Sequence, residues 1–308
     1  MTIVYWPDFY TEAHRSREDG QRLAFLLSER GFSCRPTCPP GFTPDLVFCG
    51  SIFKLEDLRR AGVDRKVPVV HYNWDLYPAM IAGEGKTNLL PWRDYIAALN
   101  DPGRTRLILV PSRSVADRTW EYAGRRSTVC LASVRPWQPP EPRPAGLPAP
   151  GSYAVDALRR YAWDRNEAVV REACQDLGIP LVETACRRPW DEYRALVHGA
   201  RFLVAGYEEM STGGLSLLEG YYHGVPVLTS NSPRNGALDY FGDRAHTFVW
   251  DDPADLRRAL GTLWRATGVE RGADLRPADN RAWVELHYSD AAFAGRLAAA
   301  FREATLHA

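Results

Sequence analysis

The chain has 308 residues, of which 45% are hydrophobic and 25% charged, and this length and composition suit two globular α/β domains. Lys and Arg together number 38, as do Asp and Glu, so no net charge attracts nucleic acid or an anionic membrane. The first residues lack a signal-peptide pattern and no apolar run is long enough to span a membrane, so we expect a cytoplasmic protein without a transmembrane segment.

Short apolar strands alternate with helical patterns in residues 1–133. This alternation is typical of parallel βαβ units and predicts a doubly wound sheet. Ser112 or Ser114 is expected to cap the last of these helices. The predicted strands lie at 3–6, 46–49, 67–71 and 107–110, and the predicted helices at 17–30, 55–61, 93–100 and 114–122.

A proline-rich segment, 134–150, follows this first domain and contains seven prolines. Such a density is incompatible with a helix or a central strand, so we expect an interdomain linker or, alternatively, a surface loop. The alternation of strands and helices then resumes, and residues 151–285 are predicted to form a second Rossmann-like domain. Residues 286–308 are predicted to be helical.

A predicted strand–loop–helix–strand unit is the most informative segment of the chain. The strand at 201–205 leads through a polar loop with Gly213 and Gly214 into a helix, and the next strand begins at Val225. Glycines let the backbone approach a phosphate, and the unpaired N–H groups of a helix's first turn attract an anion. Glu219 lies about one turn into the helix, close enough to reach a hydroxyl of the ligand.

This segment resembles the donor-binding segment of family 4 retaining glycosyltransferases, which carries an E-x7-E pattern followed by a Gly-(Val/Thr)-Pro-Val strand. Glu219 matches the second glutamate, and Ser211 stands where the family has the first. Either the acceptor for the sugar hydroxyl is lost, or Glu209 supplies it from two positions earlier. The resemblance implies that Glu219 binds the ribose hydroxyls. The donor-binding residues it implies are Ser211, Thr212, Gly213, Gly214, Leu215 and Glu219.

A second match lies upstream, where Arg160 and Arg165 follow a predicted strand at 153–155. They resemble the family's Arg-x4-Lys pair, which binds the donor's diphosphate, with Arg165 in the place of the lysine. Two cations at this spacing can converge on one pyrophosphate. The resemblance implies that they stabilise the departing diphosphate in place of a metal ion, so we expect neither a metal nor a cofactor.

The third match begins at His71 and resembles the family's strand that ends in His-Asp-(Leu)-(Trp/Tyr)-Pro. Asp75 aligns with the aspartate, whereas Trp74 stands at the position of the histidine and His71 lies three residues earlier. Asp75 or His71 is therefore expected near the acceptor, and Trp74 and Tyr72 are candidates for stacking on it. Alternatively, the backbone satisfies His71 and the aromatic rings pack beneath a loop.

Together these matches imply an α/β protein with the GT-B fold. In this fold two Rossmann-like domains face each other across a cleft, and the C-terminal helix crosses back onto the first domain. The catalytic candidates are Arg160, Arg165, Glu209, Asp75 and His71.

The implied activity is metal-independent, retaining transfer of a sugar from a nucleotide-diphosphate sugar to an unidentified acceptor, which is a glycan, a small molecule, a protein or a modified nucleic acid. One alternative is a GT-B epimerase or hydrolase of sugar nucleotides. Another is a non-catalytic nucleotide-sugar-binding protein, which the substitutions at Ser211 and Trp74 favour.

Overall fold

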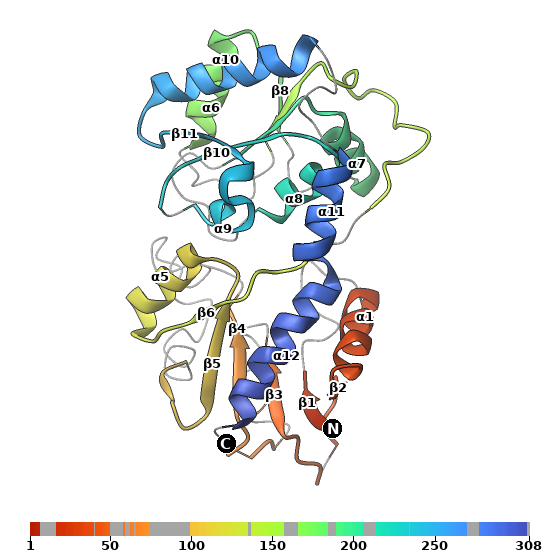
Figure 1. Ribbon diagram of the computed structural model, residues 1–308, viewed down its shortest axis with the longest axis vertical. Helices are drawn as coiled ribbons and strands as arrows, with labels where there is room; N and C mark the ends of the chain where they lie inside the picture. Colours follow the sequence, from red (N-terminus) through yellow and green to blue (C-terminus); the bar gives the residue numbers. More distant parts are fainter. Residues whose placement is uncertain are drawn as a thin grey trace. The chain divides into compact units, whose positions relative to one another are not determined.

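The computed structural model describes residues 1–6, 17–39, 41–49, 58, 62–64, 66–73, 99–134, 137–156, 166–183, 189–205, 214–233, 235–269 and 277–306. The chain divides into two compact units, drawn in Figure 1. The first unit combines Met1–Ser133 with Tyr288–Ala308, and the second comprises Val134–His287. Each unit is built around its own parallel β-sheet.

A parallel sheet with the strand order β2-β1-β3-β4-β5-β6 forms the centre of the first unit. Both β3 and β4 are buried along their whole length, which is typical of parallel strands that are covered on both faces. The strands are β1 (Thr2–Tyr5), β2 (Phe32–Arg35), β3 (Leu46–Cys49), β4 (Val69–Tyr72), β5 (Thr105–Val110) and β6 (Thr128–Val129). The four strands predicted for this half of the chain are confirmed as β1, β3, β4 and β5.

Two helices of the first unit, α1 (Arg17–Ser28) and α5 (Arg113–Ala123), lie close to the predicted ranges. The hydroxyl of Ser112 accepts a hydrogen bond from the backbone N–H of Val115 at 3.3 Å, so Ser112 is the cap of α5. The helix ends at Gly124, whose φ of 64° lies in the left-handed region that favours glycine. The predicted helices at 55–61 and 93–100 lie largely outside the described residues.

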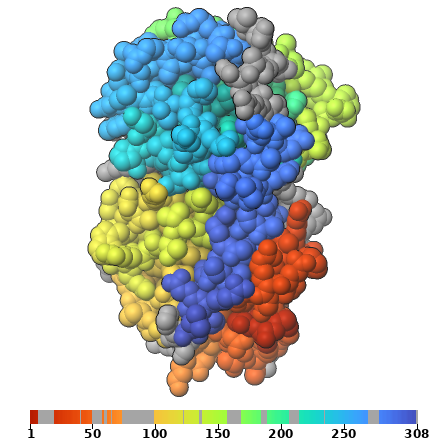
Figure 2. Space-filling view, in the orientation of Figure 1, coloured from red at the N-terminus to blue at the C-terminus, as the bar shows by residue number. Residues whose placement is uncertain are grey.

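The last helix, α12 (Asp290–Leu306), completes the core of the first unit and runs along its sheet (Figure 1). Its buried face contributes Phe293, Leu297 and Phe301 to the same apolar cluster as the strands. The Phe301 ring packs edge-on against Phe32 and Phe48, with centroids 5.4 and 5.2 Å apart. The C-terminal residues therefore belong to the core that the N-terminal strands begin, and Figure 2 shows α12 lying beside α1.

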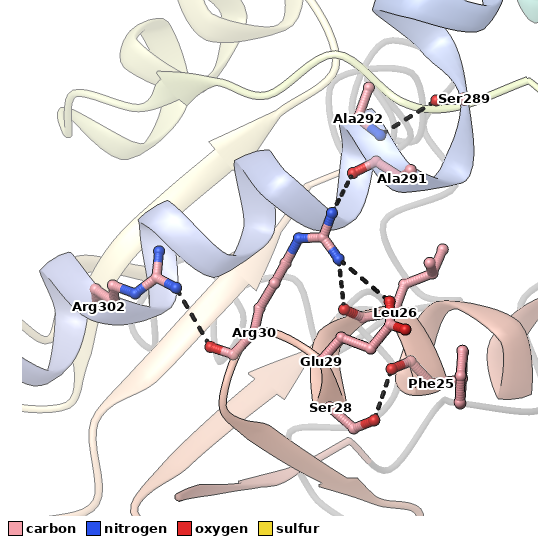
Figure 3. Close-up of polar contacts among 9 residues, drawn as sticks. All are labelled: Phe25, Leu26, Ser28, Glu29, Arg30, Ser289, Ala291, Ala292 and Arg302. Carbon is pink, nitrogen blue, oxygen red and sulfur yellow. Dashed lines mark hydrogen bonds and ion pairs between the residues drawn. The ribbon is translucent and has the colours of Figure 1, made fainter.

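Arg30, just after the end of α1, fixes α1 to α12 (Figure 3). Its guanidinium donates hydrogen bonds to the carbonyl of Leu26 at 2.7 Å and to that of Ala291 at 3.3 Å. In return, the guanidinium of Arg302 donates to the carbonyl of Arg30 at 3.2 Å. Hydrogen bonds thus join the end of α1 to the first turn of α12 and to Arg302 in its C-terminal half.

A second parallel sheet, with the order β11-β10-β9-β7-β8, forms the centre of the second unit. Its strands are β7 (Ala154–Asp156), β8 (Leu181–Glu183), β9 (Leu203–Ala205), β10 (Val227–Ser230) and β11 (His246–Phe248). The helices that follow these strands along the chain are α6 (Asn166–Asp176), α7 (Trp190–Gly199), α8 (Leu215–Tyr222), α9 (Ala237–Phe241), α10 (Pro253–Val269) and α11 (Pro277–Tyr288). The predicted strand–loop–helix–strand unit corresponds to β9, α8 and β10.

The proline-rich segment contains neither a helix nor a strand in its described part, 137–150. Arg143 holds this segment against the second unit, because its guanidinium donates to the carbonyl of Ala195 at 2.6 Å and to the Tyr153 hydroxyl at 3.1 Å. The indole of Trp137 is also buried. The segment from Val134 onward is accordingly part of the second unit.

Candidate functional site

The two sheets share one feature of their strand order. In each unit, the first strand along the chain lies between the second and the third. In such a sheet the connections change direction between the first and third strands, and ligands bind beyond the carboxyl ends of these two strands. In the second unit they are β7 and β9, which pair in parallel with Val155 opposite Leu203 and Asp156 opposite Val204. This edge of the second sheet is therefore the candidate site.

The segments that follow β7 and β9 carry most of the predicted donor-binding residues. Since β7 ends at Asp156 and its neighbour β9 ends at Ala205, both segments start from the same edge of the sheet. The predicted site residues that lie outside the described part of the chain are Trp74, Asp75, Arg160, Arg165, Glu209, Ser211, Thr212 and Gly213.

Gly214 and Leu215 mark the beginning of α8. Gly214 has φ 67° and ψ 57°, and its carbonyl accepts hydrogen bonds from the N–H groups of Leu217 and Leu218 at 2.9 and 3.2 Å. A methyl group at this position would lie 2.9 Å from Cδ1 of Leu217, so both the conformation and the space require glycine. The N-terminus of α8, with the partial positive charge of its helix dipole, thus follows directly after the segment 206–213.

Gly220 brings α8 close to the sheet. A methyl group at Gly220 would overlap Cδ1 of Leu203 in β9 and would lie 3.2 Å from Cγ1 of Val197 in α7. This close packing fixes the height of the helix above β9. It also fixes the backbone of the neighbouring residue, Glu219.

The carboxylate of Glu219 accepts a hydrogen bond at 2.8 Å from the hydroxyl of Tyr193, a residue of α7. Tyr193 is not among the site residues expected from the sequence, because nothing in the local pattern shows that α7 and α8 are neighbours. The bond places Tyr193 beside the one described residue that is predicted to bind ribose.

A buried hydrogen-bond network joins the carboxyl ends of β9 and β10. The hydroxyl of Thr229 donates to the carbonyl of Ala205 at 2.8 Å. The side-chain amide of Asn235 donates to the Thr229 hydroxyl at 2.7 Å and to the carbonyl of Ser230 at 2.6 Å. Because buried, connected polar groups resist displacement, this network makes the edge of the sheet beside β9 rigid.

In the first unit, His71 lies near the end of β4 and is only 3% exposed. Burial, followed by the nearby cations Arg104 and Arg125, lowers the pKa of its imidazole to about 4. The imidazole is therefore neutral at pH 7. A role beside an acceptor would require it to act from this buried position.

Tyr72 is 2% exposed and belongs to the apolar cluster of the first unit. Its hydroxyl donates to the carbonyl of Cys130 at 2.5 Å, and its ring packs edge-on against Phe48 and Phe293. Of the two alternatives that the sequence leaves open for this ring, packing inside the protein is the one observed. An apolar ring with a satisfied hydroxyl is stable there, and it is not available for stacking on an acceptor.

Among the described residues, no three His, Cys, Asp or Glu side chains converge on a position where they could hold a metal ion. No helix in this part of the chain combines the length and the apolar composition required to cross a membrane.

No protein-family model and no curated protein sequence matches the chain. Solved structures do match. HepE from Anabaena, in complex with UDP and glucose, has a TM-score of 0.61 and 11% identity over 98% of this chain and 100% of its own. Sucrose-phosphate synthase from Thermosynechococcus elongatus has a TM-score of 0.62 and 13% identity over 100% of both chains. AviGT4, a glycosyltransferase involved in avilamycin A biosynthesis, has a TM-score of 0.54 and 14% identity over 100% of this chain and 99% of its own.

These matches extend over nearly the whole of each chain, so they include both parallel-sheet units and the helices around them. At identities this low, the structural similarity establishes a common fold and no more. The chain therefore has the GT-B fold that the resemblance implies.

Proposed function

We propose that this protein transfers a sugar from a nucleotide-diphosphate donor to an acceptor. One observation carries the proposal: β7 and β9 flank the switch point of the second sheet and lead into the two segments that bear Arg160, Arg165 and the glycine loop. The GT-B fold supports it, since HepE, which shares the fold, has been crystallised with UDP and with UDP-glucose.

The demanding step of such a transfer is departure of the nucleoside diphosphate, because negative charge builds up on its leaving oxygens. We assign Arg160 and Arg165 to the stabilisation of that charge, since a guanidinium can bind phosphate oxygens in a bidentate manner. The first-turn N–H groups of α8, which begins at Leu215, would act on the same phosphates. These cations and dipoles supply the charge stabilisation that a divalent ion supplies in other transferases, so we propose transfer without a metal.

The resemblance to family 4 supports retention of the anomeric configuration. In that scheme no protein side chain is the nucleophile, and the leaving phosphate takes the proton of the acceptor. Glu209 or Ser211 would hold the donor sugar. Asp75 is the preferred residue beside the acceptor, because His71 is buried and neutral.

The proposal is tested first by binding. Melting temperatures of the protein should be measured with UDP, GDP, ADP and TDP, and with the sugar conjugates of each. A nucleotide that binds only the folded state raises the melting temperature. At a concentration 100 times its Kd it adds about 2.7 kcal/mol to the free energy of unfolding. We expect one base to be preferred. Absence of a shift with every nucleotide would contradict the proposal.

Turnover separates the transferase from its alternatives. The preferred sugar nucleotide should be incubated with and without a panel of acceptors, in the presence and absence of a chelator. Acceptor-dependent release of the nucleoside diphosphate supports transfer, and insensitivity to the chelator supports the absence of a metal. Free sugar or an isomerised donor without any acceptor would indicate a hydrolase or an epimerase, and binding without turnover a non-catalytic protein.

A further inference from the structure

The first turn of α7 presents an aromatic stack close to Glu219. The rings of Trp190 and Tyr193 lie nearly parallel, with centroids 5.1 Å apart and an angle of 12° between their planes. The guanidinium of Arg194 lies over the Trp190 ring at 4.9 Å and over the buried Trp137 ring at 5.7 Å. The indole of Trp190 nevertheless remains 54% exposed. The stacked Trp190 ring thus restrains the Tyr193 ring.

The hydroxyl of Tyr193 in turn restrains Glu219, to whose Oε2 it donates a hydrogen bond of 2.8 Å. A glutamate side chain loses substantial rotamer freedom when a ligand immobilises it. A hydrogen bond to an ionised carboxylate is stronger than one between neutral groups, so it can select a single rotamer before the ligand arrives. The carboxylate offers about four acceptor positions, so the bond to Tyr193 is compatible with hydrogen bonds to a ligand.

We propose that Tyr193 is a positioning residue for ribose recognition, which holds the Glu219 carboxylate ready to accept hydrogen bonds from the 2′- and 3′-hydroxyls of the donor nucleotide. This inference rests on the proposed function, because it takes Glu219 to be the ribose-binding residue. Tyr193 touches Glu219 and acts through it, whereas Trp190 holds the Tyr193 ring.

If Tyr193 holds Glu219 in this way, the protein should discriminate between nucleotides that contain ribose and nucleotides that contain deoxyribose. A carboxylate held at a fixed position loses its hydrogen bonds when the hydroxyls are absent, and unsatisfied polar groups of a binding site reject such ligands strongly. A carboxylate free to rotate can turn towards water instead. Removal of the Tyr193 hydroxyl should therefore weaken binding of the ribonucleotide more than binding of its deoxy counterpart.

The test is calorimetric titration with the preferred nucleoside diphosphate and with its 2′,3′-dideoxy counterpart. For the native protein we expect about a hundredfold weaker binding of the dideoxy ligand. For Tyr193→Phe we expect the ribonucleotide to bind about tenfold more weakly and the ratio of the two affinities to fall by a similar factor. Melting temperatures would show that the variant is folded.

Tyr222→Phe is a matched control. The Tyr222 hydroxyl donates to Oε1 of Glu285 at 3.1 Å, so this change also removes one tyrosine–glutamate hydrogen bond, from the same helix as Glu219. We expect it to leave both affinities unchanged. In a Glu219→Gln background, Tyr193→Phe should have little further effect, because the two residues act through one contact.

Each outcome has one meaning. Unchanged discrimination in a folded Tyr193→Phe variant would overturn the inference, whereas binding of the ribonucleotide by the native protein would still support the proposed function. Failure of the native protein to bind any nucleoside diphosphate would overturn both. If Tyr193→Phe does not fold, Trp190→Ala takes its place: it keeps the hydroxyl and removes the stacked ring, and it should lower the discrimination by a smaller factor.

Discussion

The hydroxyl of Ser133 donates a hydrogen bond of 2.7 Å to Oδ1 of Asp290, a residue 157 positions further along the chain. Ser133 ends the N-terminal part of the first unit, and Asp290 begins α12 after the chain has returned from the second unit. The other carboxylate oxygen of Asp290 lies 3.4 Å from Nε of Arg22 in α1. One buried aspartate thus joins the two places where the chain passes between the units.

Replacement of Asp290 with Ala should lower the free energy of unfolding by about 2–4 kcal/mol, because it leaves the Ser133 hydroxyl without this acceptor and removes a negative charge from the N-terminus of α12. Asp290→Asn keeps an acceptor and should cost less. Urea unfolding measures both values. Asp251→Ala, at an exposed aspartate, is the control, and an equal loss in that variant would show that Asp290 has no special role.

Two glycine-to-alanine changes within helices should change the free energy of unfolding in opposite directions. Gly220→Ala places a methyl group against Leu203 and Val197, and this overpacking should lower stability by about 1–3 kcal/mol. Gly295→Ala in α12 meets nothing within 4 Å, so the better helix propensity of alanine should raise stability by about 0.5–1 kcal/mol. Melting temperatures test both signs. A stabilising Gly220→Ala would contradict the close packing of α8 on β9.

The protein should lose stability as the pH falls from about 6.5 to about 4, because the pKa of His71 is lowered to about 4 from an ordinary value of 6.5. In that window the unfolded chain binds a proton at His71 that the folded protein does not bind. The contribution of His71 is therefore present above pH 6.5 and declines on acidification, by about 3 kcal/mol in total.

Urea unfolding at several pH values, for the native protein and for His71→Gln, measures this contribution. The variant should show a smaller loss of stability between pH 6.5 and 4. The same pH dependence in His71→Gln and in the native protein would show that His71 does not contribute.

If Arg165 binds the departing diphosphate, Arg165→Ala should lower kcat about a thousandfold with little change in melting temperature. Arg165→Lys restores the residue of the resembled motif and keeps the charge, so it should retain turnover within about tenfold of the native rate. Steady-state release of the nucleoside diphosphate measures both. Near-native turnover of Arg165→Ala would remove this residue from the phosphate site.

The strands that the sequence predicts are those with a continuous apolar run. β3 and β4 consist almost entirely of apolar residues and are buried, so composition alone identifies them. β2 and β6 are missed, because β2 contains Ser33 and Arg35, β6 has only two residues, and both lie at the edges of the sheet. Edge strands bury less side-chain surface, so their sequences carry a weaker signal.

Contacts between neighbouring residues can likewise be predicted from the sequence, whereas contacts between distant segments cannot. The Ser112 cap follows from one residue type at the start of a helical pattern. By contrast, the bond between Tyr193 and Glu219 and that between Ser133 and Asp290 depend on how distant segments pack. The burial of Tyr72 also depends on the packing of distant segments, because Phe293, which packs against its ring, comes from α12.

The placement of α12 in the core of the first unit determines when that unit can finish folding on the ribosome. Its strands and α1 are synthesised first, but Phe293 and Phe301 emerge only after the entire second unit has been made. The second unit, whose residues are contiguous, can reach its native state during translation. The first unit must keep apolar surface uncovered until α12 has been synthesised, so it is the part of a nascent chain that chaperones would protect.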